Sequence, residues 1–227
     1  MNLIDNPEKI NSGFFYFIKF DYICSMDIHM LIEASHTLGK DRGFWEKEKD
    51  LREEILYILS NVGDIAKAVK KGRKANWTEY DAAVKSYSDI YDEYEMVEIK
   101  KQNFKKYIKD SFEDEIANVI LRITDIIGGK KINITEVNPW IAPCEHTELN
   151  YFFRNVKPTE EFTGNTPRFL NEAIHICMFH SNEDKDYGLS HILFYLGSII
   201  EFYDIDIEKH LIKKIEYNRT RPTLYRG

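Results

Sequence analysis

The sequence contains few of the residues that cross-link or interrupt a polypeptide chain. Its 227 residues include only three cysteines, six prolines and eleven glycines. The cysteines, Cys24, Cys144 and Cys177, are odd in number and widely spaced, and no two of them form a Cys-x-x-Cys pair. This pattern indicates neither a disulfide framework nor a cysteine zinc site. We therefore expect reduced thiols with a structural role.

Long hydrophobic runs are also missing. The longest apolar run, residues 14–18, is far shorter than the roughly 20 residues that a membrane-spanning helix needs. No basic segment or cleavage site precedes this run, so nothing in it indicates a secretory signal. The sequence therefore predicts a cytoplasmic protein with no membrane anchor.

The chain also lacks an excess of positive charge. The chain has 31 lysines and arginines against 38 aspartates and glutamates, a formal net charge of −7. Because attraction to the phosphate backbone supplies much of the affinity for DNA and RNA, this balance disfavours stable nucleic-acid binding. Hydrophobic residues make up 43% and charged residues 30% of the chain. These proportions are typical of a folded globular protein of one large or two small domains.

The sequence does contain strong helical periodicity. Apolar residues recur every three or four positions, which is the period of an amphipathic helix. Ser111 has the side chain of a helix N-cap, while Gly39, Gly72 and the pair 128–129 follow periodic stretches, where glycine commonly ends a helix. The predicted helices cover residues 28–38, 51–71, 111–127, 170–178, 189–200 and 206–217. We therefore expect an all-α fold, a bundle of helices whose apolar stripes face one another.

Composition divides the chain into four segments. Residues 1–27 are predicted to form an N-terminal arm, and the proline-containing stretch 139–167 is predicted to be a linker. Between them, residues 28–138 form a first helical unit that carries a polar, tyrosine-rich helical insertion at 77–108. Residues 168–227 form a second unit.

The two helical units resemble each other. Residues 114–120 align with 187–193, an offset of 73 positions, and residues 59–64 align with 170–175 at a different offset. The second unit therefore mainly lacks the insertion of the first. We interpret this as a tandem duplication in which two helical hairpins pack as a pseudo-dimer.

Two helices carry oxygen-bearing side chains at a spacing suited to a cation. Residues three apart on a helix lie on the same face, one turn apart. Asn61 and Asp64 form one such pair, and Glu115 and Asn118 form another. Two facing helices with these pairs would supply oxygen ligands of the kind that Mg²⁺ prefers.

These segments resemble the MazG-like all-α nucleoside triphosphate pyrophosphohydrolases. The likeness lies in residues 36–45 with their Gly-Phe-Trp, in 59–68, in 114–125, and in the terminal Lys-x-x-Tyr-Asn-x-x-Arg of 214–221. It implies two helical repeats in which a Glu-x-x-Glu and a Glu-x-x-Asp motif bind Mg²⁺, which activates water and clamps the triphosphate. It also implies nucleotide-binding roles for Trp45, Lys214, Tyr217, Asn218 and Arg221.

Carried over position by position, the four metal ligands of the family become Asn61, Asp64, Glu115 and Asn118. Two of the four carboxylates are therefore amides, which removes two negative charges that would attract a dication. The resemblance leaves Asp64 and Glu115 as catalytic residues, with Mg²⁺ or Mn²⁺ bound weakly. Asn61 and Asn118 could instead be hydrogen-bonded residues of a site that has lost catalysis.

The second unit has a different set at the same positions. Glu172, His175, Gly188 and His191 cannot form a magnesium cage of hard oxygen ligands. Glu172, His175 and His191 are candidates for Zn²⁺ or another transition metal, and the alternative is that both histidines are core residues. The interval from His191 to Lys214 resembles the family spacing, so the second unit keeps the phosphate-binding tail.

The sequence thus predicts a nucleotide-binding protein, with three open interpretations. The first is Mg²⁺-dependent hydrolysis of an NTP or dNTP to the monophosphate and pyrophosphate. The second is an inactive relative that binds or sequesters a nucleotide, such as a signalling nucleotide, or regulates a partner. The third, a purely structural helical scaffold, is disfavoured by the terminal motif, since a scaffold needs no such Lys, Asn and Arg together. Separately, Trp45 and Phe44 either stack on a base, as the resemblance implies, or fill core. A homodimer is expected, since members of the family associate through their helices.

Overall fold

In the computed structural model, every helix or strand assigned is an α-helix within the part of the chain that it describes, which confirms the all-α fold. That part comprises residues 26–47, 50–87, 89–90, 92–133, 149–155, 164–180 and 185–221. Its helices are α2 (Ile28–Asp41), α3 (Leu51–Lys71), α4 (Trp77–Lys85), α5 (Glu93–Tyr107), α6 (Phe112–Lys130), α8 (Leu149–Asn155), α9 (Thr166–His180), α10 (Lys185–Phe202) and α11 (Ile207–Arg219). Within these ranges, no helix has the length and apolar content that crossing a membrane would require.

Two residues that the sequence predicts as helix caps do begin and end central helices. The Ser111 hydroxyl accepts a hydrogen bond from the backbone N–H of Asp114, as expected of the N-cap of α6. Gly72 ends α3 in the left-handed conformation, with φ of 61°, where a residue with a Cβ would be strained. Both predicted boundaries are confirmed.

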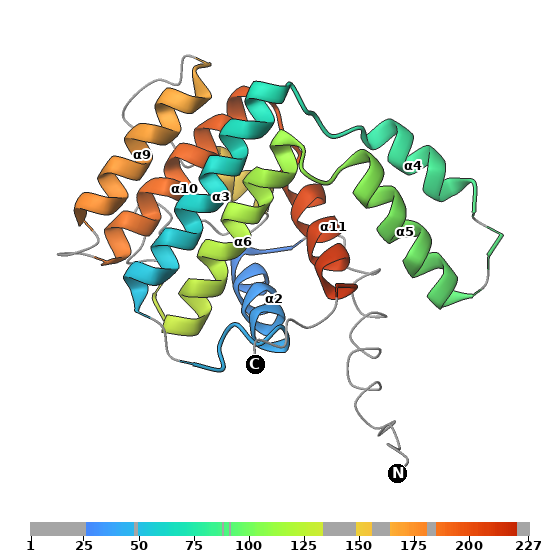
Figure 1. Cartoon of the computed structure of the whole chain (residues 1–227), viewed down its shortest axis with the longest axis horizontal. Coiled ribbons are helices and arrows are strands. Elements are labelled where there is room, and N and C mark those ends of the chain that lie inside the picture. The colour runs from blue at the N-terminus through green and yellow to red at the C-terminus, as the bar shows by residue number, and fades with distance from the viewer. Residues whose placement is uncertain are drawn as a thin grey trace, which may run out of the picture.

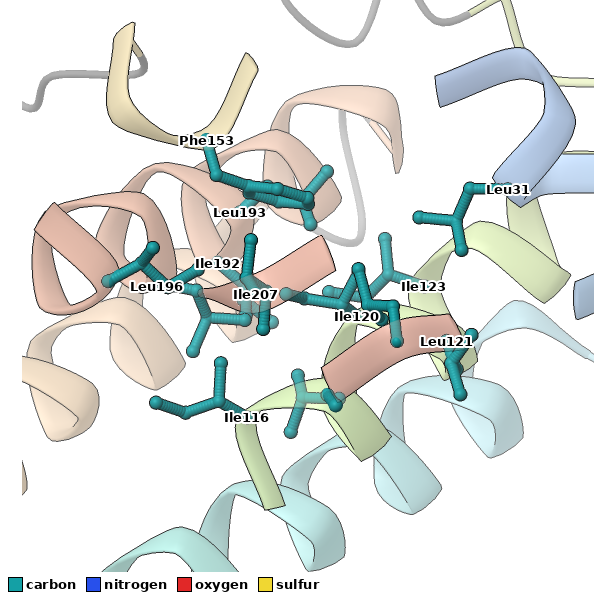
Figure 2. Packing of buried hydrophobic residues seen from close by; sticks show 14 of the residues in the cluster. Leu31, Ile116, Ile120, Leu121, Ile123, Phe153, Ile192, Leu193, Leu196 and Ile207 are labelled. Carbon is teal, nitrogen blue, oxygen red and sulfur yellow. The ribbon is translucent and has the colours of Figure 1, made fainter. Parts of the chain in front are cut away.

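Helix α6 lies in the middle of the bundle and packs against α2, α3, α10 and α11 (Figure 1). In Figure 2, Ile116, Ile120 and Ile123 of α6 lie in the same apolar cluster as side chains from α2, α8, α10 and α11. One hydrophobic core therefore joins the two predicted units. Helix α3 packs on α6 and α9 packs on α10, as two helical hairpins, but the tandem duplication and the pseudo-dimer stay predictions.

Part of the predicted linker belongs to this core. Helix α8 lies inside 139–167, and its Leu149 and Phe153 are fully buried. Single prolines on both sides of it, among them Pro143 and Pro158, favoured a linker, and a helix of only seven residues is too short to show a clear period. The rest of 139–163 lies outside the described residues. The predicted arm does so too, except for Met26 and Asp27; Met26 is buried, and its N–H donates to Glu208.

Two of the predicted helix ends are wrong, because the glycines there serve close packing between helices. Helix α2 continues past Gly39 to Asp41, and a Cβ at Gly39 would lie 2.5 Å from an oxygen of Asp125. Helix α6 continues through Gly128 and Gly129, where added Cβ atoms would lie 2.8 Å from His36 and 2.0 Å from Trp45. The glycines let α2 and the segment after it approach α6 closely.

Replacing Gly129 with alanine is expected to lower the free energy of unfolding by about 1–3 kcal/mol, because the new methyl group would displace the Trp45 ring. The matched control is Gly63→Ala in the middle of α3, where no atom of the described residues lies within 4 Å of an added Cβ. That substitution is expected to stabilise the protein by about 0.5–1 kcal/mol through helix propensity. Urea unfolding measures both. Equal effects of the two substitutions would contradict the packing role of Gly129.

The predicted insertion, 77–108, contains the two helices α4 and α5, which extend to one side of the bundle (Figure 1). They have a small apolar cluster of their own, made by Tyr80, Phe104 and Ile108 together with Tyr217 of α11. Phe104 and Tyr217 stack with their ring centroids 4.7 Å apart. The insertion is therefore attached to the bundle mainly through α11.

Candidate functional site

A cavity of about 310 Å³ lies where α2, α3, α6 and the C-terminal end of α11 meet. Polar and aromatic side chains contribute most of its lining, and several of them belong to the motifs identified in the sequence. The polar lining residues are Ser35, Arg42, Asn61, Asn118, Arg122, Asp125, Asn218 and Arg221, with Phe44 and Tyr57 as the aromatic ones. The cavity therefore brings together residues that are more than 150 positions apart in the chain.

Asp125 organises one wall of this cavity. Its Oδ1 accepts a hydrogen bond from Trp45 Nε1 at 2.7 Å and lies 3.3 Å from His36 Nδ1, while Oδ2 accepts from Arg122 at 3.2 Å. Burial raises the pKa of Asp125, and these donors oppose that shift. The absence of a side chain at Gly39 leaves room for this carboxylate. Asp125 therefore holds both Trp45 and Arg122 in place.

Arg122 is neutralised within the wall. Its guanidinium donates to Glu54 as well as to Asp125, and the Glu54 side chain is buried. The same group lies 5.3 Å from the ring centroid of Phe44 and 5.4 Å from that of Tyr57, within cation–π range. Two carboxylates thus balance Arg122, which serves to position the aromatic rings beside the cavity.

Arg42 and Arg221 differ from Arg122 in this respect. Arg42 is 8% exposed, and its guanidinium lies 5.3 Å from the Phe44 ring centroid. Burial and, next, the positive charge of Arg221 lower the pKa of Arg42, so the two guanidinium groups lie close enough to repel each other. Across the described ranges, neither forms an ion pair with a carboxylate. Together they make an anion-attracting end of the cavity.

The predicted metal ligands lie on the packed helices α3 and α6, but only the two asparagines line the cavity. Asp64 Oδ1 is paired with the Lys67 ammonium at 2.6 Å. Glu115 is buried and accepts a hydrogen bond from Asn118 Nδ2 at 2.7 Å. Burial raises the pKa of Glu115, and the nearby charges of Asp114 and Asp64 act in the same direction.

This donor set does not match a magnesium cage of four carboxylates. Within the described ranges, no three histidine, cysteine, aspartate or glutamate side chains gather as a metal site. Asp64 pairs with the exposed Lys67, and the Asn118 amide donates to the carboxylate that should bind metal. Binding of Mg²⁺ or Mn²⁺ therefore stays a prediction of the resemblance, as do the catalytic roles of Asp64 and Glu115.

The predicted nucleotide-binding residues separate into two groups. Asn218 and Arg221 line the cavity, and within the described ranges the buried Oδ1 of Asn218 has no hydrogen-bond partner. Trp45, Lys214 and Tyr217 do not line it. Trp45 donates to Asp125, Tyr217 stacks on Phe104, and the buried Lys214 ammonium lies 2.7 and 2.8 Å from the two oxygens of Asp114.

The alternative site in the second unit is not assembled by the residues that can be described. Glu172 accepts from Arg168 Nε at 3.1 Å, one turn earlier on α9, and His175 is exposed. The side chain of His191 lies outside the described residues. A transition-metal site there stays a prediction.

Sequence reasoning assigned no role to Arg42, Arg122 or Tyr57, although all three line the cavity. Arg42 and Arg122 do stand inside the motif segments 36–45 and 114–125. An arginine three residues before Asp125 could have indicated an ion pair on one helix face. Nothing in the sequence indicated that Glu54 would complete the neutralisation of Arg122 while Arg42 kept its charge unpaired.

No protein-family model, curated protein or solved structure matches the chain. The likeness to MazG-like proteins therefore rests on sequence motifs alone, and the physical case for a ligand rests on the cavity.

Proposed function

We propose that the chain is a MazG-like nucleotide-binding protein whose ligand occupies the cavity between α2, α3, α6 and α11. The observation that carries this proposal is the pair of guanidinium groups, Arg42 and Arg221, that share one cavity without a carboxylate partner in the described part of the chain. An anion stabilises two like charges that line one cavity, and guanidinium groups suit phosphate in geometry as well as charge.

The remaining lining supports a nucleotide over a simple anion. Phe44 and Tyr57 offer aromatic surface for a base, and each contacts a guanidinium that holds it beside the cavity. Asn61, Asn118 and Asn218 offer amide groups, each with an acceptor and donors for the edges of a base or the hydroxyl groups of a sugar. Pockets for small molecules combine a few placed polar groups with apolar walls in this way.

Nucleotide binding can be tested with a panel of nucleotides and a substitution at the exposed Arg221. We expect at least one nucleotide to raise the melting temperature of the protein. Arg221→Gln is expected to lower the affinity for that nucleotide by about tenfold or more. Arg52→Gln on α3 is the matched control, because Arg52 is exposed and does not line the cavity. If no nucleotide binds, or if both variants bind as well as the unchanged protein, the proposal fails.

Hydrolysis is the second candidate function. It is supported by Asp64 and Glu115, whose carboxylates are close enough on α3 and α6 for their charges to interact. Phosphorus NMR with NTPs and dNTPs, with and without Mg²⁺ or Mn²⁺, tests it. Pyrophosphate that appears only with metal, and not in Glu115→Gln, would make the protein a pyrophosphohydrolase. Binding without turnover would make it an inactive relative that sequesters a nucleotide.

A further inference from the structure

The positive charge available to a ligand in the cavity is small. Of its three arginines, Arg122 is balanced by Glu54 and Asp125, so only Arg42 and Arg221 can respond to an incoming anion. The lysine of the terminal motif adds nothing, because Lys214 is buried against Asp114. A phosphate monoester carries about −1.5 to −2 charges at pH 7, which two guanidinium groups match. The β- and γ-phosphates of a triphosphate would add negative charge that these groups cannot balance.

A divalent cation would ordinarily offset the charge of a triphosphate. The predicted metal ligands are poorly arranged to bind such a cation, since Asp64 is paired with Lys67 and Asn118 donates to Glu115. The cavity is also small. Its 310 Å³ lies at the lower end of the range of about 300–1,000 Å³ for small-molecule pockets.

At Asn218 the cavity requires a hydrogen-bond donor from the ligand instead of a negative charge. The Oδ1 of Asn218 is a buried acceptor at the cavity with no partner among the described residues, and such a group is costly unless a ligand donates to it. Asn118 also keeps an oxygen available, because its Nδ2 is the atom that bonds Glu115. A phosphate dianion has no proton to donate to either oxygen. A ribose hydroxyl or a base N–H does.

We propose, on the basis of the proposed nucleotide-binding function, that the ligand of this cavity is a nucleoside monophosphate that binds without a divalent cation. Its phosphate contacts Arg42 and Arg221. Its sugar or base donates to Asn218, and the base lies against the aromatic wall that Arg122 holds in place. The site therefore selects a dianion at one end and a hydrogen-bond donor at the other.

Calorimetric titration of the whole protein in EDTA tests the proposal. The ligands are the ribonucleoside and deoxyribonucleoside monophosphates, the matching nucleosides and triphosphates, ribose 5-phosphate and inorganic phosphate. We expect one monophosphate to bind about tenfold or more tightly than its nucleoside and than inorganic phosphate, as loss of a charge-assisted bond predicts. Its triphosphate is expected to bind no tighter, and added Mg²⁺ is expected to leave the monophosphate affinity unchanged.

Two variants connect the affinity to the arginines. Arg42→Gln and Arg221→Gln are each expected to weaken binding of the monophosphate by about tenfold or more. Arg221→Gln is also expected to leave nucleoside binding unchanged, whereas Arg42 contacts the Phe44 ring as well. Arg52→Gln is expected to change neither. Arg221 is exposed, so its variant remains informative should the substitution at buried Arg42 prevent folding.

The outcomes separate this inference from the function on which it rests. If a triphosphate binds more tightly than its monophosphate, with or without Mg²⁺, the inference is overturned and nucleotide binding stands. The inference is also overturned if the nucleoside binds as well as its monophosphate, or if ribose 5-phosphate or inorganic phosphate accounts for the whole affinity. If no nucleotide or nucleoside binds, both the inference and the proposed function fail.

Discussion

Replacing Lys214 with methionine is expected to lower the free energy of unfolding by about 3–5 kcal/mol. Lys214 is 3% exposed, and its ammonium bonds both carboxylate oxygens of Asp114, which is 1% exposed. Burial raises the pKa of Asp114, and the charge and hydrogen bonds of Lys214 oppose that rise. Without the ammonium, the carboxylate would be left unpaired in the interior. Urea unfolding monitored by circular dichroism measures the loss.

Two further variants show whether the buried pair is the cause. Lys213→Met, at the neighbouring position, removes only a partly exposed pair with Glu216 one helical turn away, and is expected to cost about 1 kcal/mol or less. Adding Asp114→Asn to Lys214→Met is expected to recover part of the stability, because the unpaired charge is then gone. If Lys214→Met instead unfolds like the unchanged protein and loses nucleotide affinity, Lys214 is a phosphate ligand, as the resemblance implies.

Helix positions were predictable because the apolar period and the capping residues are local signals. Ser111 and Gly72 begin and end their helices as expected. Gly39, Gly128 and Gly129 misled the prediction, because glycine has two uses that sequence alone does not separate. It ends a helix by adopting a positive φ, and it also lets another segment approach a helix closely. Only the positions of Asp125, His36 and Trp45 distinguish these uses.

The candidate site was partly predictable from the terminal motif. Asn218 and Arg221, read from that motif, do line the cavity, and so do Asn61 and Asn118. The fate of Lys214 was not predictable, because its partner lies 100 positions earlier in the chain. Likewise, the lack of a carboxylate partner for Arg42 among the described residues depends on which parts of the chain fold near it. Residue identities were readable in the motifs, whereas charge balance depends on tertiary contacts.

His210 is expected to reduce the stability of the protein as the pH falls from about 6.5 to about 4, by about 3 kcal/mol in total. The His210 side chain is buried, its Nε2 accepts a hydrogen bond from Trp77 Nε1 at 2.9 Å, and no hydrogen-bond partner for Nδ1 exists in the described residues. Burial lowers the pKa of His210 to about 4, with help from the charges of Lys209 and Lys214 and against that of Asp206.

The sign follows from proton uptake. Between these pH values the unfolded chain binds a proton at His210 that the folded chain does not, so acid favours unfolding. The buried carboxyls Asp114, Glu115 and Asp125 have raised pKa values and act in the opposite direction. Their contribution cancels when unfolding of the unchanged protein is compared with that of His210→Gln at each pH.

The glutamine amide can still accept from Trp77 but does not titrate, so the stability of the unchanged protein relative to this variant is expected to decline on acidification. A difference that stays constant from pH 7 to pH 4 would mean that His210 keeps its ordinary affinity for protons. Protonation would then break the hydrogen bond that joins α4 to α11 without a cost in stability, since an imidazolium has no lone pair with which to accept from Trp77.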